Sequence, residues 1–136
     1  MKQKAIIVDI DGTLAHMNGR SPYDYTQVHL DLVDPIIRDM VARYYETHRV
    51  FVLSGRKAEC YQSTQQWLID NQVMHNVLYM RKDDDNREDS VVKSEIFYNE
   101  IFPKYDVDFV LDDRDRVVQM WRDIGLKCLQ VAPGNF

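Results

Sequence analysis

Cysteine is scarce in this chain, and its scarcity limits the covalent and metal-binding features that the sequence permits. The 136 residues include two cysteines, Cys60 and Cys128, which lie far apart in the sequence. Both fall in stretches that predict regular structure, and neither has the spacing of a metal ligand. We therefore expect two reduced core thiols, as in a cytoplasmic protein, and no disulfide. The four histidines are equally scattered and carry no metal-ligand spacing.

Long apolar runs and an excess of positive charge are also missing. No run approaches the roughly 20 apolar residues that span a bilayer, and the N-terminus lacks the apolar core of a signal peptide. The sequence therefore predicts no membrane association and a cytoplasmic location. The net charge of −5 argues against broad, non-specific nucleic-acid binding, but it leaves recognition of a strand end open. Without repeats or low-complexity segments, residues 1–136 are expected to form one domain.

The most informative stretch covers residues 5–14, with the sequence Ala-Ile-Ile-Val-Asp-Ile-Asp-Gly-Thr-Leu. Its first four residues are apolar, as in a strand buried on both faces of a parallel sheet. Asp9 and Asp11 follow on the same side of the chain, where two neighbouring carboxylates need a cation or a proton between them. Gly12 permits a sharp turn, and Thr13 adds a hydroxyl and an amide. We interpret Asp9 as a nucleophile and Asp11 as an acid/base, both beside a metal ion.

A second predicted strand, Arg49–Leu53, ends in Ser54, Gly55 and Arg56. Small residues between a strand and a helix expose backbone amides, which suit a phosphate group. Ser54 can donate a hydrogen bond to that phosphate, and Arg56 can add a bidentate, charge-assisted contact. The simpler alternative for Ser54 is an ordinary helix cap.

A lysine stands at an unusual position in a later helix. The sequence predicts a helix over residues 89–102, with Lys93 in the first turn, where a cation is unfavourable for the helix dipole. That position indicates a specific anionic partner, and we expect Lys93 to bridge the Asp9 carboxylate and the oxygens of a phosphate. Asp89 lies four residues earlier, so we expect it to orient the ammonium group by a salt bridge.

Another acidic pair follows a predicted strand at residues 107–111. Asp112 and Asp113 lie at the carboxyl end of that strand, and their oxygens are suitable ligands for Mg²⁺. The charged run at residues 81–88 contains three consecutive aspartates, but we interpret it as a solvated loop in preference to a second metal site.

Strands and helices alternate along the rest of the chain. Asp34 and Pro35 are typical of a helix start, residues 58–71 have helical character, and further strands are predicted at 76–80 and 126–131. This alternation predicts an α/β fold, a three-layer sandwich with a mainly parallel, Rossmann-like sheet and its active groups at the carboxyl ends of the strands. The apolar helix faces are expected to include Ile36, Ile37, Met40, Val41 and Tyr44 in the first helix, and Tyr61, Gln65, Leu68 and Ile69 in the second.

Residues 15–31 show no clean periodicity and are expected to form a short flap beside the active site. Asn18-Gly19 favours a hairpin turn, and Pro22 interrupts regular structure. Arg20 has two interpretations, a contact to the substrate phosphate or a solvated turn residue. Tyr23 and Tyr25 differ from the other aromatic residues because they do not fall at the spacing of a core-facing helix, so a base-stacking role stays open for them.

The segment Asp-Ile-Asp-Gly-Thr-Leu resembles the signature of the haloacid dehalogenase superfamily of phosphohydrolases, in which the first Asp is phosphorylated and then hydrolysed. The expected downstream groups follow in order, namely Ser54, Lys93 and the Asp112-Asp113 pair. The resemblance implies a haloacid dehalogenase-like fold. No insertion is large enough to form a separate cap domain, so we expect an open site that favours a large substrate.

A narrower resemblance extends over nearly the whole chain, to the phosphatase domains of bacteriophage polynucleotide kinase/phosphatases. It is carried by Asn-Gly-Arg at 18–20, Ser-Gly-Arg at 54–56, the segment 89–97 and the segment 111–122. It implies a Mg²⁺-dependent 3′-phosphatase that repairs DNA or RNA ends through an aspartyl-phosphate, with a separate kinase or ligase as a partner, in the host cytoplasm if the chain is phage-encoded. The implied residues are Asp9, Asp11, Lys93 and Asp89 for catalysis; Thr13, Arg20, Ser54, Gly55 and Arg56 for phosphate binding; and Asp9, Asp11, Asp112 and Asp113 for the metal, with Asp11 contributing its backbone carbonyl.

The phosphate-binding loop of a kinase is absent from this sequence, so we expect no kinase activity and either a stand-alone phosphatase or a fragment of a bifunctional protein. Two alternatives remain at this point. One is an uncapped phosphatase of a small phosphorylated metabolite or nucleotide. The other is a catalytically silent module that binds nucleic-acid ends, which the concentration of four carboxylates around Lys93 disfavours.

Overall fold

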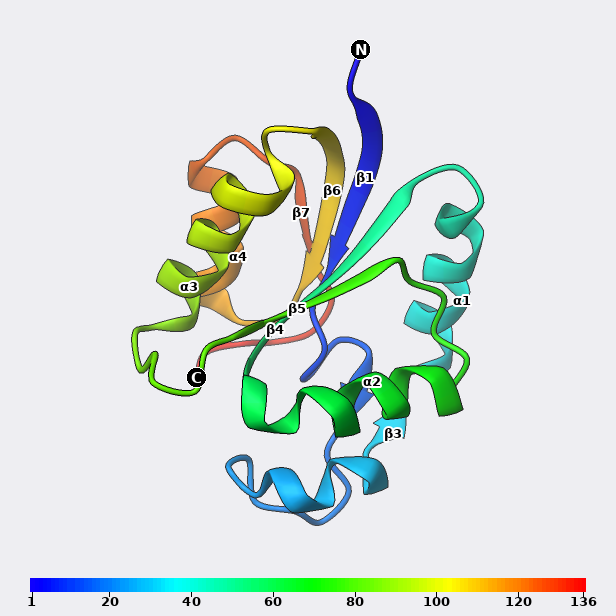
Figure 1. The fold of residues 1–136 in the computed structure, drawn as a ribbon, viewed down its shortest axis with the longest axis vertical. Coiled ribbons are helices and arrows are strands. Elements are labelled where there is room, and N and C mark those ends of the chain that lie inside the picture. Colours follow the sequence, from blue (N-terminus) through cyan, green and yellow to red (C-terminus); the bar gives the residue numbers. More distant parts are fainter.

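A five-stranded parallel sheet forms the centre of the molecule (Figure 1). The computed structural model describes all residues 1–136. The strand order is β5-β4-β1-β6-β7, and every neighbouring pair is parallel. The expected three-layer α/β fold is therefore confirmed. The strands are β1 (Gln3–Val8), β4 (Arg49–Lys57), β5 (Val77–Arg81), β6 (Tyr105–Asp112) and β7 (Cys128–Gln130).

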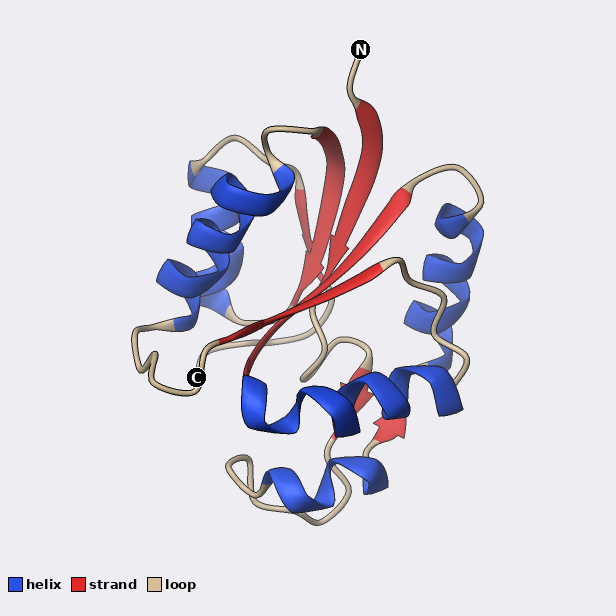
Figure 2. Cartoon of the chain, in the orientation of Figure 1, coloured by secondary structure: helices blue, strands red, loops and turns tan.

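Helices cover both faces of the sheet (Figure 2). On one side lie α1 (Pro35–Tyr45) and α2 (Tyr61–Asp70), and on the other lie α3 (Asp89–Ile96) and α4 (Asp115–Asp123). Strand β1 serves both layers, because Ile6 belongs to the core cluster with Leu68 of α2, and Ile7 belongs to the cluster with Trp121 of α4. Alternate residues of a strand point to opposite faces, so a continuous apolar run is what this central position requires.

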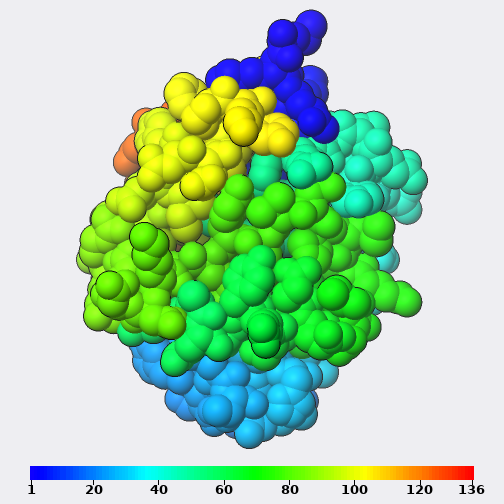
Figure 3. Space-filling view, viewed as in Figure 1, coloured from blue at the N-terminus to red at the C-terminus, as the bar shows by residue number.

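Residues 15–31 form a lobe beside the carboxyl ends of the strands. Strands β2 (Ala15–His16) and β3 (Leu32–Val33) pair antiparallel at its base, and the 3-10 helix η1 (Tyr25–Leu30) lies between them. Asn18-Gly19 therefore does not make the tight hairpin that its sequence favours, although Gly19 has a φ of +81°. Figure 3 shows this lobe in light blue directly beneath the green surface of α2. No larger cap covers the site.

Two predicted helix faces are partly wrong. In α1, Ile37 and Val41 are buried as expected, but Ile36 is 72% exposed. In α2, the buried residues are Thr64, Trp67 and Leu68, and Ile69 is exposed. These buried residues are at i, i+3 and i+4, the spacing of one helix face, and the 3-10 helix η2 (Ala58–Cys60) precedes α2.

The other predicted boundaries differ from the observed ones by a few residues in either direction. The predicted helix over 89–102 consists of α3 followed by the π-helical turn η3 (Phe97–Ile101). Asp34 is the N-cap of α1 as expected, because its Oδ1 accepts hydrogen bonds from the amides of Ile36 and Ile37, both at 3.1 Å. All the helices are too short or too polar to span a bilayer.

Candidate active site

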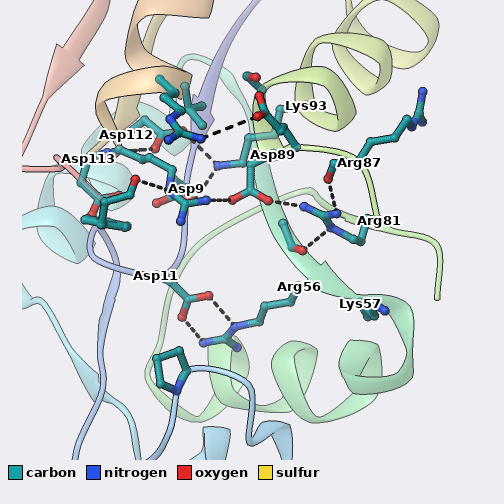
Figure 4. A pocket seen from close by; sticks show the side chains of 18 of the residues that line it. Asp9, Asp11, Arg56, Lys57, Arg81, Arg87, Asp89, Lys93, Asp112 and Asp113 are labelled. Atoms are coloured by element: carbon teal, nitrogen blue, oxygen red, sulfur yellow. Dashed lines mark hydrogen bonds and ion pairs between the residues drawn. The ribbon is translucent and has the colours of Figure 1, made fainter. Parts of the chain in front are cut away.

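The predicted site residues converge at the carboxyl edge of the sheet. Asp9 directly follows β1, Asp112 ends β6, and Gly55 and Arg56 lie in the last part of β4. Lys93 reaches the same place from α3, so that its side chain and three carboxylates point toward one another (Figure 4). Parallel strands end together at this edge, which is where open α/β sheets bind their ligands.

Three buried carboxylates lie together, and one ammonium group binds two of them. Asp9, Asp112 and Asp113 each offer an oxygen atom within 4.8 Å of the others. Lys93 Nζ donates to Asp9 Oδ1 at 2.7 Å and to Asp112 Oδ2 at 3.0 Å, and all four side chains are buried. Thr13 Oγ1 donates to the other oxygen of Asp9 at 3.0 Å. The cluster therefore orients both oxygens of Asp9.

The electrostatics of this cluster favour a further positive charge. Burial raises the pKa of Asp9 well above its usual value, and the neighbouring Asp112 carboxylate raises it again, whereas Lys93 lowers it. Burial lowers the pKa of Lys93, but the charges of Asp112 and Asp9 outweigh that effect and raise it overall. Lys93 therefore stays charged at neutral pH, while Asp9 is held in an environment that resists its ionisation.

This donor set fits a divalent cation. Three carboxylates face a single ammonium group, so an excess of negative charge remains when all are ionised. Carboxylate oxygens in a compact group are the ligands that Mg²⁺ prefers. The side chain of Asp11 is not part of this group, and the contact of its backbone carbonyl with the metal stays a prediction.

The two adjacent aspartates are held differently. Asp112 Oδ1 accepts from the amides of Asp113 at 2.9 Å and Arg114 at 3.4 Å, and its Oδ2 accepts from Lys93. Asp113 instead lies so close to Gly12 that a Cβ atom at that position would overlap its Oδ2. Gly12 also has a φ of +84°. Only glycine satisfies both the backbone conformation and this close approach.

A second charged network holds Asp11. Arg56 donates to both oxygens of Asp11, at 3.0 and 2.7 Å, and Arg20 adds a longer contact of 3.4 Å. Asp31, which has a fully buried side chain, binds both guanidinium groups: Arg20 at 2.8 and 2.9 Å, and Arg56 at 2.9 Å. The side chain of Arg20 is 1% exposed, so its interpretation as a solvated turn residue is wrong.

Sequence reasoning missed Asp31. It lies between Leu30 and Leu32 in the stretch without periodicity, and no motif there marks its carboxylate as part of a charged network. Only the convergence of Arg20 from the flap and Arg56 from β4 gives it two cationic partners.

The predicted salt bridge between Asp89 and Lys93 is wrong. Asp89 instead pairs with Arg81 and with Arg114, the latter at 2.8 Å. The reason is that Lys93 turns inward to the acidic cluster, away from its own helix surface. Asp89 also packs against Gly55, where a Cβ atom would stand 2.7 Å from its Oδ1.

The segment 81–88 is only partly the solvated loop that its sequence predicts. Arg81 is 8% exposed, and besides Asp89 it donates to the carbonyl oxygens of Gly55, Asp85 and Arg87. It thereby fastens the loop and the start of α3 to the end of β4. The sequence did not predict this role of Arg81, because Arg81 stands at the start of a charged run.

An open cavity of about 800 Å³ lies above these groups. Its lining includes Asp9, Asp11, Gly55, Arg56, Asp89, Lys93, Asp112 and Asp113. Three predicted phosphate-binding residues, Thr13, Arg20 and Ser54, are not part of the lining. Ser54 is buried inside β4, and its Oγ accepts a hydrogen bond from the Arg56 amide at 3.1 Å, so here it orders the backbone at Arg56.

Comparisons of this chain with known proteins agree on one family. The family model described as the polynucleotide kinase PNKP phosphatase domain matches residues 3–136. A putative bifunctional polynucleotide kinase/RNA ligase of Autographa californica nuclear polyhedrosis virus is 34% identical in an alignment 128 residues long, which covers 89% of this chain and 18% of that protein. The chain thus spans less than a fifth of that relative.

Solved structures agree at the level of the fold. Two structures of the Pnkp1/Rnl/Hen1 complex, one described as an RNA repair complex, contain a chain that is 39% identical, with TM-scores of 0.95 and 0.96. Each match covers 99% of this chain but 44% and 48% of the other. A haloacid dehalogenase-like hydrolase from Streptococcus pneumoniae shares the fold, with a TM-score of 0.63 and 12% sequence identity. The match covers 94% of this chain and 84% of the chain of that hydrolase.

Proposed function

This chain belongs to the polynucleotide kinase phosphatase domain family of the haloacid dehalogenase superfamily, and we propose that it is a Mg²⁺-dependent phosphatase that removes the terminal 3′-phosphate from nucleic acids. Membership supports phosphoric monoester hydrolysis at nucleic-acid ends. The observation that carries the proposal is the buried group of Asp9, Lys93, Asp112 and Asp113 at the floor of an open cavity.

Asp9 is the nucleophile in this proposal. One of its oxygens attacks the phosphorus in line, the bond from phosphorus to the 3′-oxygen breaks, and an aspartyl-phosphate forms. Lys93 and Thr13 hold the carboxylate in place, at 2.7 and 3.0 Å. Water then attacks the phosphorus of the intermediate, which releases inorganic phosphate and restores Asp9.

Asp11 is the acid/base. It protonates the leaving 3′-oxygen and then takes a proton from the attacking water. Arg56 occupies both oxygens of Asp11, so Asp11 must be released before it can act. We propose that the substrate phosphate replaces Asp11 as the partner of Arg56 and Arg20, which stay anchored through Asp31.

Asp9, Asp112 and Asp113, with the backbone carbonyl of Asp11, would hold Mg²⁺. When bound, the ion offsets the repulsion between the Asp9 carboxylate and the phosphate dianion. Lys93 and the two arginines then share the negative charge that develops on the phosphoryl oxygens, and the Gly55 backbone borders the same space. Asp89 serves as a positioning residue, because its contacts are Arg81, Arg114 and Gly55.

The open cavity supports a polymer end as the substrate. Its volume of about 800 Å³ exceeds what a lone phosphate group needs and lies within the range of ordinary ligand sites. No large cap closes over it, so a chain can extend out of the mouth.

Relatives described as a kinase/ligase and as part of an RNA repair complex support a partner kinase or ligase. The two free, buried cysteines are consistent with work in the cytoplasm, in a host cell if the gene is viral.

The test is phosphate release from short oligonucleotides. DNA and RNA versions with a 3′-phosphate are compared with a 5′-phosphorylated oligonucleotide, a 3′-mononucleotide and a sugar phosphate, each with Mg²⁺ and with a chelator. We expect Mg²⁺-dependent release from the 3′-phosphorylated ends alone. Equal efficiency on the small substrates would point to a metabolite phosphatase. Folded, metal-binding protein that binds the ends but releases nothing would point to a silent binding module.

A further inference from the structure

One aromatic ring at the mouth of the cavity has no partner in the protein. Tyr23 is 85% exposed and lines the same cavity as Asp9, Asp11 and Lys93. Its side chain makes no hydrogen bond, ring–ring contact or cation–π contact. Isolated exposed aromatic residues are common on protein surfaces, so exposure alone decides nothing. What distinguishes Tyr23 is its place beside the phosphate-binding floor.

The backbone that carries this ring is held tightly. The amide of Asp24 donates to the carbonyl of Ser21 at 3.0 Å, which closes a four-residue turn with Pro22 at its second position and Tyr23 at its third. Arg20 Nη1 also donates to the carbonyl oxygens of Ser21 and Pro22, both at 3.2 Å. Proline restricts the turn further. The ring is therefore presented outward by a backbone that is already ordered, which reduces the entropy lost on binding.

The other two aromatic residues of the cavity are less exposed than Tyr23. Phe136 lies under the guanidinium group of Arg114, 4.9 Å from the ring centroid. Tyr25 is half-buried at the start of η1, and burial raises the pKa of its hydroxyl. Tyr23 is the most exposed of these three rings, at 85% against 60% for Phe136.

We propose that Tyr23 is the stacking platform for the base of the 3′-terminal nucleotide. This inference rests on the proposed function, since a phosphate at Asp9 brings the base of the same nucleotide to the cavity wall. Every base has an aromatic face, so stacking on a tyrosine tolerates any sequence, as repair of arbitrary ends requires. Tyr23 binds the base and takes no part in the chemical step, which belongs to Asp9 and its neighbours at the floor of the cavity.

The experiment compares two oligonucleotides that differ only in the base of their last residue. Both carry a 3′-phosphate, and one has an abasic terminal sugar. For Tyr23→Ala we expect KM for the base-bearing substrate to rise about tenfold, the size of one stacking contact, with kcat within about twofold. Tyr23→Phe keeps the ring and should behave as wild type, as should Ile36→Ala, which removes a similarly exposed apolar residue outside the cavity. On the abasic substrate the variants and the wild type should agree.

Equal losses on both substrates, or no loss on either, would overturn the stacking role. A parallel binding measurement separates this inference from the proposed function. Anisotropy of labelled oligonucleotides is recorded in the Asp9→Asn background, where no phosphate is released. If the wild type proves inactive on all ends but binding still depends on the base through Tyr23, the stacking role stands and the catalytic proposal fails. Binding that ignores both the base and Tyr23 contradicts the stacking role whatever the activity.

Discussion

Asp9 is placed in an environment that opposes its own ionisation. It is buried beside Asp112 and Asp113, which raises its pKa, and Lys93 offsets only part of that effect. A nucleophilic carboxylate needs the charged form, so the site stores unfavourable energy that a bound cation relieves. Perturbed carboxylates of this kind are typical of functional sites.

Replacing Asp9 by Asn should remove this cost. Because the pKa of Asp9 is raised in the folded state, the folded protein holds that proton more strongly than the unfolded chain. Its stability therefore falls as pH rises from about 4, the usual Asp value, through the raised folded value. We expect Asp9→Asn to abolish turnover, to stabilise the metal-free domain at pH 7 by about 1 kcal/mol, and to flatten this pH dependence.

Urea unfolding with a chelator, repeated from pH 4 to pH 8, measures the effect. Asp39→Asn, at an exposed carboxylate on α1, is the control and should follow the wild-type curve. A less stable Asp9→Asn variant at neutral pH would contradict the electrostatic account. Full phosphatase activity of that variant would remove Asp9 from the role of nucleophile.

At the scale of elements, the buried residue Asp31 connects the flap to the sheet and to α2. Asp31 ends η1, its carboxylate binds Arg20 of the flap and Arg56 of β4, and its carbonyl accepts from Trp67 Nε1 of α2 at 2.9 Å. Three elements thus meet at one residue. The ion pairs of the Asp31 carboxylate hold Arg20 and Arg56 in position at the proposed phosphate site.

Asp31→Asn should therefore damage catalysis through the arginines. Displacing a phosphate-binding group by about 1 Å can cost on the order of a hundredfold in rate, and we expect a loss of kcat of that size with Mg²⁺ binding intact. Removing one partner of a buried ion pair also costs about 3–5 kcal/mol of stability, so activity is measured well below the melting temperature. Asp24→Asn, which changes a carboxylate at the other end of η1, is the control. A kcat equal to that of the wild type would show that Arg20 and Arg56 do not depend on Asp31.

At the scale of the whole molecule, charge is distributed unevenly. The net charge is −5, yet the cavity mouth carries several cations. Most of them pair with carboxylates, as Arg87 does with Asp85 and Glu95 and Arg116 does with Glu88. Lys57 is different, because its Nζ donates to the neutral amide of Asn86 at 2.8 Å and has no carboxylate partner. The remaining cations of the lining are Arg56, Arg81, Lys93 and Arg114.

Lys57 should therefore contact a phosphodiester next to the terminal phosphate. We expect Lys57→Gln to raise KM for an oligonucleotide and to reduce the slope of log kcat/KM against log salt concentration by about 0.7–0.9, the value for one lost phosphate contact. A 3′-mononucleotide lacks that phosphodiester and should be unaffected. Lys104→Gln, at an exposed lysine outside the cavity, is the control. An unchanged salt slope would exclude the contact.

The chemistry of the site follows from short stretches of sequence. Asp9, Asp11 and Gly12 lie within four residues of one another, after a run whose apolar character predicts a central strand. The parallel order of that strand with β4 and β6 then brings Gly55, Arg56, Asp112 and Asp113 to the same edge. Local pattern and the geometry of parallel sheets were sufficient for these residues, because each one lies within a few residues of the carboxyl end of a strand.

The ion pairs depended on tertiary structure. Asp89 and Lys93 are four residues apart, which suggests a contact between them, but Lys93 finds buried carboxylates and Asp89 finds Arg81 and Arg114. Spacing along a helix gives a weak preference of a few tenths of a kcal/mol. A buried charge without a partner costs far more, so the distant carboxylates determine where Lys93 points.

By itself, therefore, the sequence determined the α/β class, the acidic motif and the reaction type that those residues support. The tertiary structure alone decided that Asp31 unites Arg20 and Arg56, that Arg81 fastens the loop before α3, and that Tyr23 faces the cavity. The physical reason is the range of the interactions involved. Strand pattern and turns act between neighbours in the chain, whereas buried charges select partners from any segment that packing brings within reach.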